Sequence, residues 1–545
     1  MTYETFFEEV KGFGIPDPFF TKENKLYKIN SKNGDEEFIS RHVPYITMCF
    51  DDIERNNIQY ELKWFNDDKI YNEVVPATAL ATKREVIELA NKGLSSNDRN
   101  ARPLIEYFDL FLEKNKLKRS LVVSHIGYVG NHFIHPQMES KFRVVPPDEG
   151  ELQRLRAVQC SGSVEGWIKN VLEPLYDNPK ALFPVIASFA SVLFKEYDLT
   201  PIVVDISGIS SSGKTTVQKV CASVWGMPSG YISSMLTTKI AIERMASFLN
   251  AFPLILDDTN TAHDTKALQQ IIYMFGNGTG KMRGSLEGSR GTSSWQSVFI
   301  TTGENNILEY TNSQGSAARV IPITNFKFVN KKADYFTALN QNVEQYYGSV
   351  GLEFLKRWKH HSKRFYGRFK KLMEFYQEDA GSNNVMRRIA LHYAFIVFVG
   401  EVLNELFREE GIKIPINDFT ELFLTMCSDN DHVDRAKNVL IEVLEELDAN
   451  RSHIYGEYEP NNGIHAIVNC NGLFLTVDYV NKRLGVDAKQ IREAWKTQQH
   501  TVEQKNKGKS VDYKNITHKK QTFRVAQVNQ DFLEEQGFNF SRNCF

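Results

Sequence analysis

Apolar positions along the chain alternate between short strand-length runs and longer stretches with helical spacing, most regularly between residues 201 and 330. Five apolar runs of strand length occur here: 201–207, 230–234, 251–258, 295–304 and 320–324. The segments between them carry apolar residues three or four positions apart, as one face of a helix does. Strands separated by helices predict a parallel sheet with crossover helices on both faces.

The pattern outside this core predicts further units. Residues 1–150 mix alternating runs with helix-spaced segments, which predicts a mixed α+β N-terminal domain. Residues 151–200 predict a helical brace, and residues 331–450 a helical lid and linker. Residues 451–545 predict two short helices followed by a β-ribbon. The expected fold class is therefore a multidomain α/β protein with its core at 201–330.

A phosphate-binding loop follows the first strand of the core. The segment Gly208-Ile-Ser-Ser-Ser-Gly-Lys-Thr-Thr216 matches the P-loop pattern G-x-x-x-x-G-K-[ST]. Its glycines let backbone N–H groups point at phosphate oxygens, and the helix after it directs a positive end at them. Lys214 is expected to contact the β- and γ-phosphates of ATP, and Thr215 to bind Mg²⁺. The expected nucleotide-binding residues are Gly208, Ser210, Ser211, Ser212, Gly213, Lys214, Thr215 and Thr216.

Two other strands of the predicted sheet end in groups suited to nucleotide hydrolysis, and functional groups gather at the carboxyl ends of parallel strands. Asp257 is expected to be the Walker B carboxylate that holds Mg²⁺ or its water. Asp258 is expected to orient the attacking water, although many such ATPases have the longer Glu there. A turn after a core strand is the alternative. Thr302 is expected to offer its hydroxyl to the γ-phosphate or the attacking water, the role called sensor 1, with Glu304 and Asn305 as neighbouring candidates. Ordinary packing of threonine in a strand is the alternative.

Arginines at two places are candidates for stabilising transferred phosphate charge. Arg319 directly precedes the last strand, at the edge of the core, where it can meet the γ-phosphate bound to a neighbouring subunit. A surface ion pair is the alternative. Arg387 and Arg388 lie in the first turn of a helix, where acidic residues are usual. We assign Arg388 to reach over the nucleotide, with Arg387 as the alternative.

Residues 353–371 combine many Lys and Arg residues with aromatic ones. The pattern is equally typical of a nucleic-acid surface and of an amphipathic helix whose basic side chains extend over an apolar face. Both interpretations stay open from the sequence.

Composition limits the class of protein. The net charge of −2 gives no chain-wide basic field, so any nucleic-acid surface must be local. Six scattered cysteines without a C-x-x-C pair argue against a disulfide framework or zinc site and favour a cytoplasmic protein. His125, His132 and His135 are expected to be structural rather than metal ligands. The N-terminus lacks a signal-peptide layout, and the apolar stretch 391–403 is too short to span a bilayer.

The chain resembles AAA+ ATPases in five features taken together. These are the P-loop, the paired carboxylates, the polar strand end, the arginine before the last strand and the helical lid. The finer pattern narrows this resemblance: Pro253-Leu-Ile-Leu-Asp-Asp258, a Gly-rich basic insertion before Trp295, Thr-Thr-Gly-Glu304 and Gly315-Ser-Ala-Ala-Arg319. It is similar to the minichromosome-maintenance-like replicative helicases carried by staphylococcal chromosome cassettes and related mobile elements. The resemblance extends from residue 150 to about 400 and is weaker in the first 120 residues and in the C-terminal part.

The resemblance implies one DNA contact, and the pattern of the C-terminal part predicts a second. In these helicases a β-hairpin projects into the pore of a hexamer and grips DNA. It precedes the strand that here begins at Trp295, and residues 276–292 match it. Lys281, Arg283 and Arg290 would then contact single-stranded DNA, with a mobile loop as the alternative. Residues 477–499 with the basic tract 505–524 have the layout of a winged helix, which would bind duplex DNA, although a solvated loop is also possible. The expected contacts in this tract are Lys507, Lys509, Lys519 and Lys520.

The leading hypothesis is a DNA helicase that depends on ATP and Mg²⁺ and initiates or drives replication of a mobile element. It is expected to form a hexamer and not to bind membranes. One alternative is an ATP-gated DNA-binding initiator or regulator that assembles without unwinding. The basic insertion before Trp295 favours translocation over such a switch. A small-molecule P-loop kinase is less favoured and predicts a monomer without DNA-stimulated hydrolysis.

Overall fold

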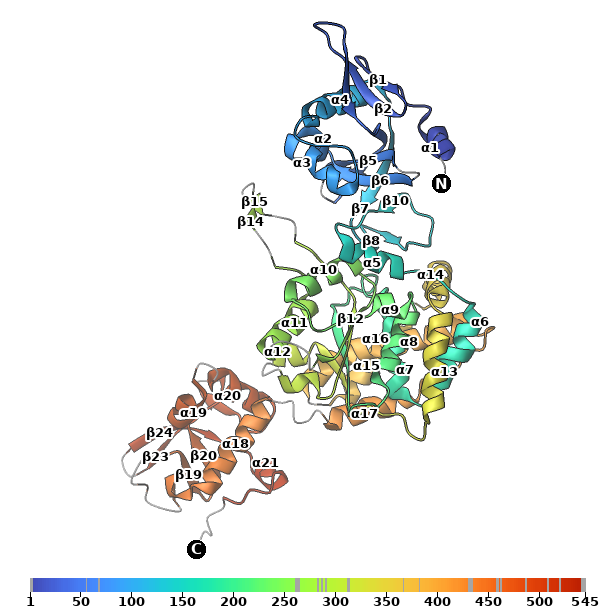
Figure 1. The fold of residues 1–545 in the computed structure, drawn as a ribbon. Helices are drawn as coiled ribbons and strands as arrows, with labels where there is room; N and C mark the ends of the chain where they lie inside the picture. Colours follow the sequence, from blue (N-terminus) through green and yellow to red (C-terminus); the bar gives the residue numbers. More distant parts are fainter. Residues whose placement is uncertain are drawn as a thin grey trace.

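The chain forms three parts, which Figure 1 shows in sequence from the blue N-terminal part through the green and yellow centre to the orange and red C-terminal part. The computed structural model describes residues 3–540. Its internal gaps are 55, 67–68, 260–264, 282–283, 286–287, 290–291, 311–313, 366, 382, 430–434, 457–459, 461–462, 486–487, 507–508 and 519–520. Each of the three parts has its own cluster of buried apolar side chains.

The N-terminal part has two sheets and a small group of helices. A three-stranded antiparallel sheet has the order β1-β2-β3: β1 (Phe19–Lys22), β2 (Lys25–Ile29) and β3 (Glu36–Ser40). A five-stranded sheet has the order β10-β7-β4-β5-β6: β10 (Phe142–Val144), β7 (Lys118–Val123), β4 (Tyr45–Asp52), β5 (Asn57–Asn66) and β6 (Lys69–Pro76). The helices are α1 (Tyr3–Val10), α2 (Thr78–Ala81), α3 (Lys83–Glu88) and α4 (Ala101–Lys114). Tyr107, Phe108 and Phe111 on the buried face of α4 pack into an apolar cluster that includes residues of both sheets.

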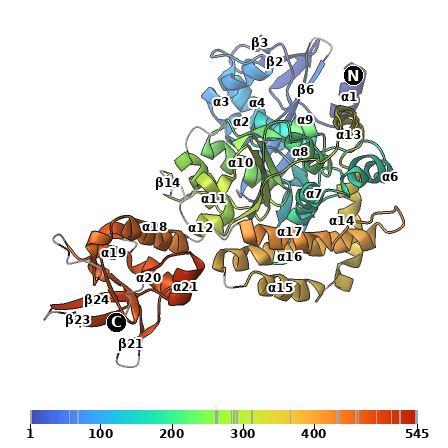
Figure 2. The ribbon, with the colours of Figure 1, turned by 90° about the horizontal axis from the view of Figure 1, so that it is seen from below.

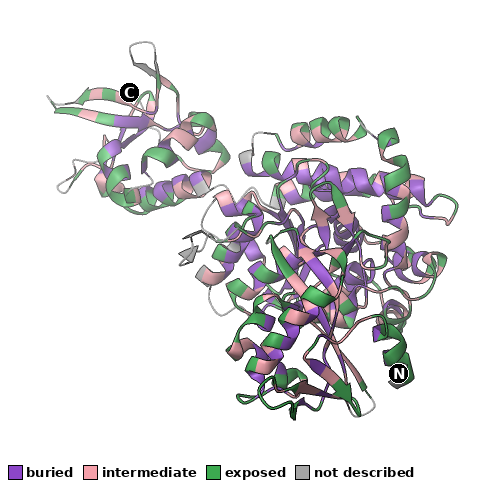
Figure 3. Ribbon diagram, turned by 90° about the horizontal axis from the view of Figure 1, so that it is seen from above, coloured by how far each residue is buried: buried purple, intermediate pink, exposed green. Residues whose placement is uncertain are grey.

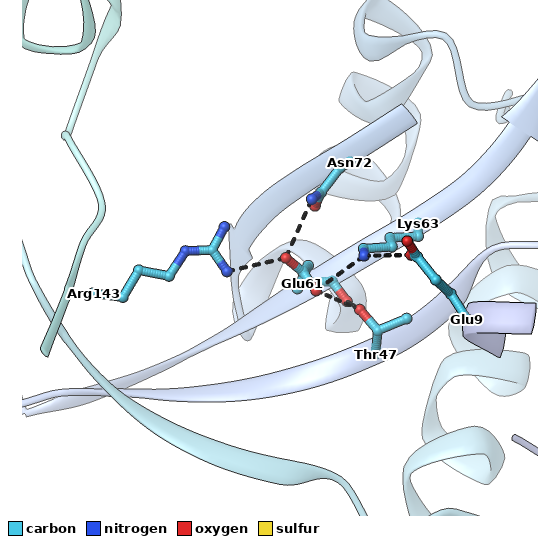
Figure 4. A network of polar contacts seen from close by, with 6 residues as sticks. All are labelled: Glu9, Thr47, Glu61, Lys63, Asn72 and Arg143. Atoms are coloured by element: carbon cyan, nitrogen blue, oxygen red, sulfur yellow. Dashed lines mark hydrogen bonds and ion pairs between the residues drawn. The ribbon is translucent and has the colours of Figure 1, made fainter. Parts of the chain in front are cut away.

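A buried carboxylate ties together the strands of the five-stranded sheet (Figure 4). Glu61 of β5 accepts hydrogen bonds from Thr47 Oγ1 at 2.6 Å, Asn72 Nδ2 at 3.2 Å and Arg143 Nη1 at 3.1 Å. Burial acts to raise the pKa of Glu61, but the bonds from Thr47 and Arg143 outweigh it, and the pKa is lowered. Because Arg143 lies on β10, the last strand before the central part, the network anchors the exit of the chain from this sheet.

A hairpin and a helix connect this part to the centre. The hairpin consists of β8 (Gly127–Val129) and β9 (His132–Ile134), and the helix is α5 (Glu149–Ala157). The hairpin docks on the central part, where Tyr128 N donates to Asn250 Oδ1 at 2.9 Å. Gly127 has φ +88° and a Cβ there would lie 2.8 Å from Asn250 Oδ1, so only glycine fits this contact. His125 at the start of the connection pairs with Glu54, with Nε2 to Oε1 at 2.6 Å.

The start of α5 holds two coupled acids. Asp148 caps the helix by accepting from Gly150 N at 3.0 Å, and its other oxygen lies 3.6 Å from Arg244 Nη1. Glu151 is buried, and burial, a hydrogen bond to Asp148 and the charge of Asp148 together raise the pKa of Glu151 to about 7. Between pH 4.5 and about pH 7, the folded protein therefore holds a proton on Glu151 that the unfolded chain has released.

We expect Glu151→Gln to stabilise the protein at pH 8 but not at pH 4. The raised pKa means that the contribution of wild-type Glu151 is fully present below pH 4.5 and is lost as the pH rises towards 7. Glutamine keeps a donor for Asp148 and never ionises, so the gain should reach at most about 3 kcal/mol above pH 7. Urea unfolding of the full chain at several pH values measures it. Glu149→Gln, an exposed change on the same helix, should show no such pH trend, and an equal trend would contradict the assignment.

The central part contains the predicted parallel sheet. Its order is β12-β13-β16-β11-β17, and all four strand pairs are parallel: β12 (Ser233–Ser234), β13 (Leu254–Asp257), β16 (Val298–Gly303), β11 (Ile202–Ser207) and β17 (Val320–Ile323). The connecting helices are α8 (Lys214–Ser223), α10 (Lys239–Leu249) and α11 (Thr265–Asn277). The prediction of a parallel sheet with crossover helices is confirmed. The strand expected at 230–234 is shorter, because Pro228 begins a short helix, α9 (Pro228–Tyr231).

Helices pack around this sheet as one continuous core. They include α7 (Pro179–Ser191) before it, and after it α13 (Ala333–Gln345), α14 (Ser349–His361), α15 (Arg368–Asp379), α16 (Asn384–Leu406) and α17 (Asp418–Asp429). Figure 2 shows α15 and α16 side by side. The segment Val385–Leu406 is long and apolar enough to cross a membrane, yet 78% of its most apolar window is buried inside the protein. Figure 3 shows this helix largely purple. Its burial is that of a helix in the protein core.

The basic stretch 353–371 packs through its aromatic residues, and its arginines pair with carboxylates. Trp358 and Phe365 are buried in the central core. Arg357 pairs with Glu410, with Nη2 to Oε1 at 2.5 Å, and this hydrogen bond raises the pKa of Arg357. Arg364 and Arg368 both pair with Glu405 on α16. These contacts favour the amphipathic-helix interpretation over the nucleic-acid surface.

The C-terminal part begins earlier in the chain than predicted. Helix α18 (Arg435–Ala449), which the prediction assigned to the lid, packs its apolar face into the C-terminal cluster. The sheet order is β18-β19-β20-β24-β23: β18 (Ile454–Tyr455), β19 (Ala466–Asn469), β20 (Gly472–Thr476), β24 (Gln521–Gln527) and β23 (Lys514–His518). The other elements are α19 (Val477–Leu484), α20 (Ala488–Thr497), β21 (Gln504–Asn506), β22 (Lys509–Val511) and α21 (Gln530–Glu535).

One buried ion pair fixes α20 to the ribbon that follows it. Arg492 Nε donates to Asp512 Oδ2 at 2.7 Å, and both side chains are less than a tenth exposed. Arg492 also donates to Asn481 on α19. Asp512 is the one acidic residue of the basic tract 505–524. Its pairing with Arg492 explains why an acidic residue stands there. A buried pair of this kind is costly to break, because removing one partner leaves an uncompensated charge.

Candidate nucleotide-binding site

A cavity of about 650 Å³ opens at the carboxyl ends of the central strands. The P-loop forms one side of it, and the ends of β13 and β16 form the other. It brings together the predicted residues Ser210 to Thr216, Asp257, Asp258 and Thr302, although they come from three separate segments. The other lining residues are Gly303, Glu304 and Phe336.

The two glycines of the P-loop are required by close contacts. Gly213 has φ +96°, and a Cβ there would lie 2.7 Å from the ring of Phe328. A Cβ on Gly208 would lie 2.6 Å from the carbonyl oxygen of Phe326. Gly208 N also donates to Gly303 O at 3.2 Å, so the loop begins directly beside the end of β16. The loop geometry therefore depends on glycine at both positions.

Lys214, the first residue of α8, places its ammonium group within the loop. Its Nζ donates to Gly208 O at 2.7 Å and to Ile209 O at 2.8 Å. Burial lowers the pKa of Lys214, while the charge of Glu304 and the weaker effects of Asp257 and Asp258 act to raise it. Lys214 is thus one cation facing three carboxylates among the described residues that line the cavity.

Hydrogen bonds through Thr302 join the end of β16 to the end of β13. Thr302 Oγ1 donates to Asp257 Oδ1 at 2.5 Å, and Asp258 N donates to Thr302 Oγ1 at 3.2 Å. Asp258 has φ +62°, a left-handed conformation that turns the chain sharply after β13. The carbonyl of Leu256 accepts from Gln218 Nε2 of α8 at 2.8 Å, which ties β13 to the helix of the P-loop.

The oxygen groups at this site suit a divalent cation. The Thr215 hydroxyl and the Asp257 carboxylate line the same cavity, and Mg²⁺ prefers one or two protein oxygen ligands together with phosphate oxygens and water. These two residues would hold the ion, which would neutralise phosphate charge when bound. Asp257 is already oriented by the bond from Thr302.

Both predicted arginines lie away from this cavity in the same chain. Arg319 packs along α11, with Nη2 donating to Asn277 Oδ1 at 2.8 Å and the guanidinium 4.8 Å from the ring centre of Tyr273. A Cβ on Gly276 would collide with the Arg319 side chain, so glycine allows this path. Arg388 is exposed on α16, as is Arg387. The structure therefore does not join them to the P-loop of their own chain.

The predicted DNA contacts are described only in part. Lys281 is exposed next to the short hairpin of β14 (Gly284–Ser285) and β15 (Gly288–Ser289), while Arg283 and Arg290 lie outside the described residues. Lys509 begins β22. Lys507, Lys519 and Lys520 also lie outside the described residues.

Sequence reasoning missed Phe336, which lines the cavity, and Asp205, which lies outside the lining on β11. Phe336 of α13 lines the cavity, and nothing in the local pattern distinguishes it from a core aromatic residue. Asp205 is fully buried in β11, where burial raises the pKa of its carboxyl to about 7. A charged residue within an otherwise apolar strand was the available signal for Asp205, because strands of parallel sheets are usually apolar throughout.

Comparison with known proteins assigns the chain to one family and shows a solved structure with a similar fold. The model of the family described as "Domain of unknown function (DUF927)" matches residues 19–295, slightly more than half of the chain. No curated protein sequence matches. The solved structure of "SCCmec type IV Cch - active helicase" superposes with a TM-score of 0.68 at 16% identity, over 96% of this chain and 99% of that chain. The C-terminal region of NrS-1 gives a TM-score of 0.31 at 10% identity, over 88% and 96%.

Proposed function

The chain belongs to the DUF927 family, and within that family we propose that it is an ATP-dependent DNA helicase of the AAA+ class. The observation that carries the proposal is the shared cavity of the P-loop lysine, the Asp257–Asp258 pair and Thr302. Phosphoryl transfer needs positioning and charge stabilisation more than covalent chemistry, and these groups provide both. The fold shared with Cch, a protein described as an active helicase, supports the helicase assignment.

In the proposed reaction each group of the cavity has a separate role. The backbone of residues 208–213 and the N-terminus of α8 bind the phosphates, and Lys214 balances the charge on the γ-phosphate. Asp257 and Thr215 would hold Mg²⁺, and Asp258 or Glu304 accepts a proton from the attacking water. The Thr302 hydroxyl, bonded to Asp257, keeps the Walker B carboxylate in place.

The hairpin before β16 supplies the proposed contact with single-stranded DNA. Its base is closed by the bridge between Thr279 and Ser294 and by Gly280 N donating to Ser293 O at 2.8 Å. Figure 1 shows β14 and β15 projecting away from the centre of the molecule. A projecting basic hairpin whose base adjoins the strand that carries Thr302 suits a part that moves DNA during hydrolysis. We assign it to the pore of a ring, as in the minichromosome-maintenance-like helicases.

The C-terminal part is proposed to bind duplex DNA as a winged helix. Helices α19 and α20 are followed by the hairpins β21–β22 and β23–β24, and the Arg492–Asp512 pair holds the ribbon against α20. In such an arrangement the second helix enters the major groove and the ribbon contacts the backbone. The Lys507, Lys509, Lys519 and Lys520 positions would supply these phosphate contacts.

Strand displacement on a forked duplex tests the helicase proposal. The wild-type protein should separate the strands with ATP and Mg²⁺, and Lys281→Ala/Arg283→Ala should lose displacement while retaining ATP hydrolysis. Lys32→Ala/Lys116→Ala removes two exposed lysines of the N-terminal part and should unwind normally. ATP hydrolysis without displacement at either fork polarity would favour the alternative, an ATP-gated initiator or regulator that assembles on DNA.

A further inference from the structure

A buried carboxylate below the P-loop has no role in the reaction described above. Asp205 lies in the middle of β11, beside Thr301 of β16 in the parallel register. Its side chain is fully buried in the centre of the sheet. A buried carboxylate is costly unless its oxygens accept hydrogen bonds, so the partners of Asp205 indicate what it holds in place.

Both oxygens of Asp205 accept hydrogen bonds, one from strand β16 and one from the loop that follows it. Thr301 Oγ1 donates to Oδ1 at 2.7 Å, and the backbone N–H of Ile307 donates to Oδ2 at 3.1 Å. Thr301 and Ile307 are both fully buried. The carboxyl group therefore joins β11, which carries the P-loop, to both ends of the segment 301–307.

The segment between these two anchors carries a carboxylate into the nucleotide cavity. Gly303, at its start, accepts from Gly208 N at 3.2 Å, and Ile307, at its end, is held by Asp205. The three residues between them are partly or fully exposed, and Glu304 lines the cavity. The charge of Glu304 acts on Lys214 more strongly than that of Asp257 or Asp258. Glu304 thus lies between Gly303, which is bonded to Gly208, and Ile307, which is bonded to Asp205.

We propose that Asp205 is a positioning residue for ATP hydrolysis, which acts through Thr301 and Ile307 to hold Glu304 opposite Lys214. The inference rests on the proposed ATPase function and adds a link that the P-loop and Walker B motifs do not contain. The two neighbouring threonines of β16 then have separate partners: Thr302 bonds Asp257 of β13, and Thr301 bonds Asp205 of β11. Together they fix three adjacent strands in one register at the site of reaction.

Thr301→Val tests the proposal while keeping the shape of a side chain suited to a strand. We expect kcat for ATP hydrolysis to fall about tenfold or more, since misplacing a reacting group by about 1 Å has effects of this size. The dissociation constant of a fluorescent ATP analogue should stay within about twofold of wild type, because the P-loop itself is unchanged. Thr301→Ser restores the hydroxyl and should restore kcat. Wild-type kcat in Thr301→Val would overturn the proposal.

Ser191→Ala is the matched control. Ser191 Oγ accepts from Val298 N at 3.0 Å, so its loss also removes a buried hydrogen bond to β16, but at the end of the strand away from the cavity. It should lower thermal stability without lowering kcat. An equal loss of kcat in Ser191→Ala would show that any weakening of β16 is enough, and would overturn the specific role of Asp205.

A double-mutant cycle and hydrogen exchange separate the inference from the proposed function. Thr301→Val should cause little further loss of kcat in a Glu304→Gln background, whereas additive losses would exclude action through Glu304.

Hydrogen exchange at the amide of Ile307 should be faster in Thr301→Val and in Asp205→Asn than in wild type or Ser191→Ala. If the wild-type protein hydrolyses no ATP, the proposed function fails, and the exchange result still decides whether Asp205 holds this segment; unchanged exchange overturns that role.

Discussion

Lys214→Ala is expected to reduce ATP hydrolysis at least 100-fold, the usual scale for losing a preorganised group that stabilises charge in the transition state. Among the described lining residues Lys214 is the only cation, and it faces Asp257, Asp258 and Glu304. Without it, a triphosphate would enter a cavity that is acidic on one side, and repulsion would weaken binding as well as the chemical step. Phosphate release with saturating Mg²⁺ and ATP measures the effect.

Two controls make the Lys214 result specific. Lys219→Ala removes a cation from the same helix, but from a position that does not line the cavity, and should leave hydrolysis near the wild-type rate. Thermal unfolding should show little change in Lys214→Ala, because its described partners, two backbone carbonyls and the Ser212 hydroxyl, all belong to the P-loop itself. Hydrolysis by Lys214→Ala at the wild-type rate would mean that the cavity is not where ATP reacts.

The parts of the site that follow from local pattern were the ones that could be predicted. The P-loop spacing, the two acids at the end of β13 and the threonine at the end of β16 are each fixed by a few consecutive residues. A parallel sheet then brings strand ends together at one edge, so the composition of the cavity followed from the order of strands and helices. The parallel sheet at 201–330 was predictable for the same reason, because each strand run is bounded by helical spacing.

The remaining features depend on contacts between residues far apart in the chain. The bond from Thr301 to Asp205 joins residues 96 positions apart, and neither residue type predicts the other. Helix α18 has an ordinary amphipathic pattern, and only packing shows that its apolar face belongs to the C-terminal cluster. The basic stretch at 353–371 could not be interpreted until Glu405 and Glu410, from another helix and the turn after it, were found beside its arginines.

Replacing Arg319 is the second change for which we expect a large loss of ATP hydrolysis. The position of Arg319 indicates whether it acts on its own chain or on a neighbouring one. Its guanidinium lies over Tyr273 and bonds Asn277, both on α11, and Arg319 does not line the cavity of its own chain. Tyr273 is half exposed, so this arrangement lies at the surface, where a second copy of the chain can approach. If Arg319 supplies charge to a neighbouring subunit, Arg319→Ala should reduce hydrolysis about 1,000-fold, the lower range for an arginine acting in trans.

Mixing two inactive variants decides whether Arg319 acts on its own chain or on a neighbour. Lys214→Ala retains Arg319, and Arg319→Ala retains Lys214, so a ring of head-to-tail contacts can rebuild complete sites where the two meet in the right order. At equal amounts and random assembly, about one quarter of the interfaces would be complete, and about one quarter of wild-type hydrolysis should return. Action within one chain predicts no recovery at any ratio.

Arg84→Ala, which removes a highly exposed arginine of the N-terminal part, should hydrolyse ATP normally in the same assay. Recovery would therefore assign the second half of the active site to the neighbouring subunit and make ring assembly a condition of hydrolysis.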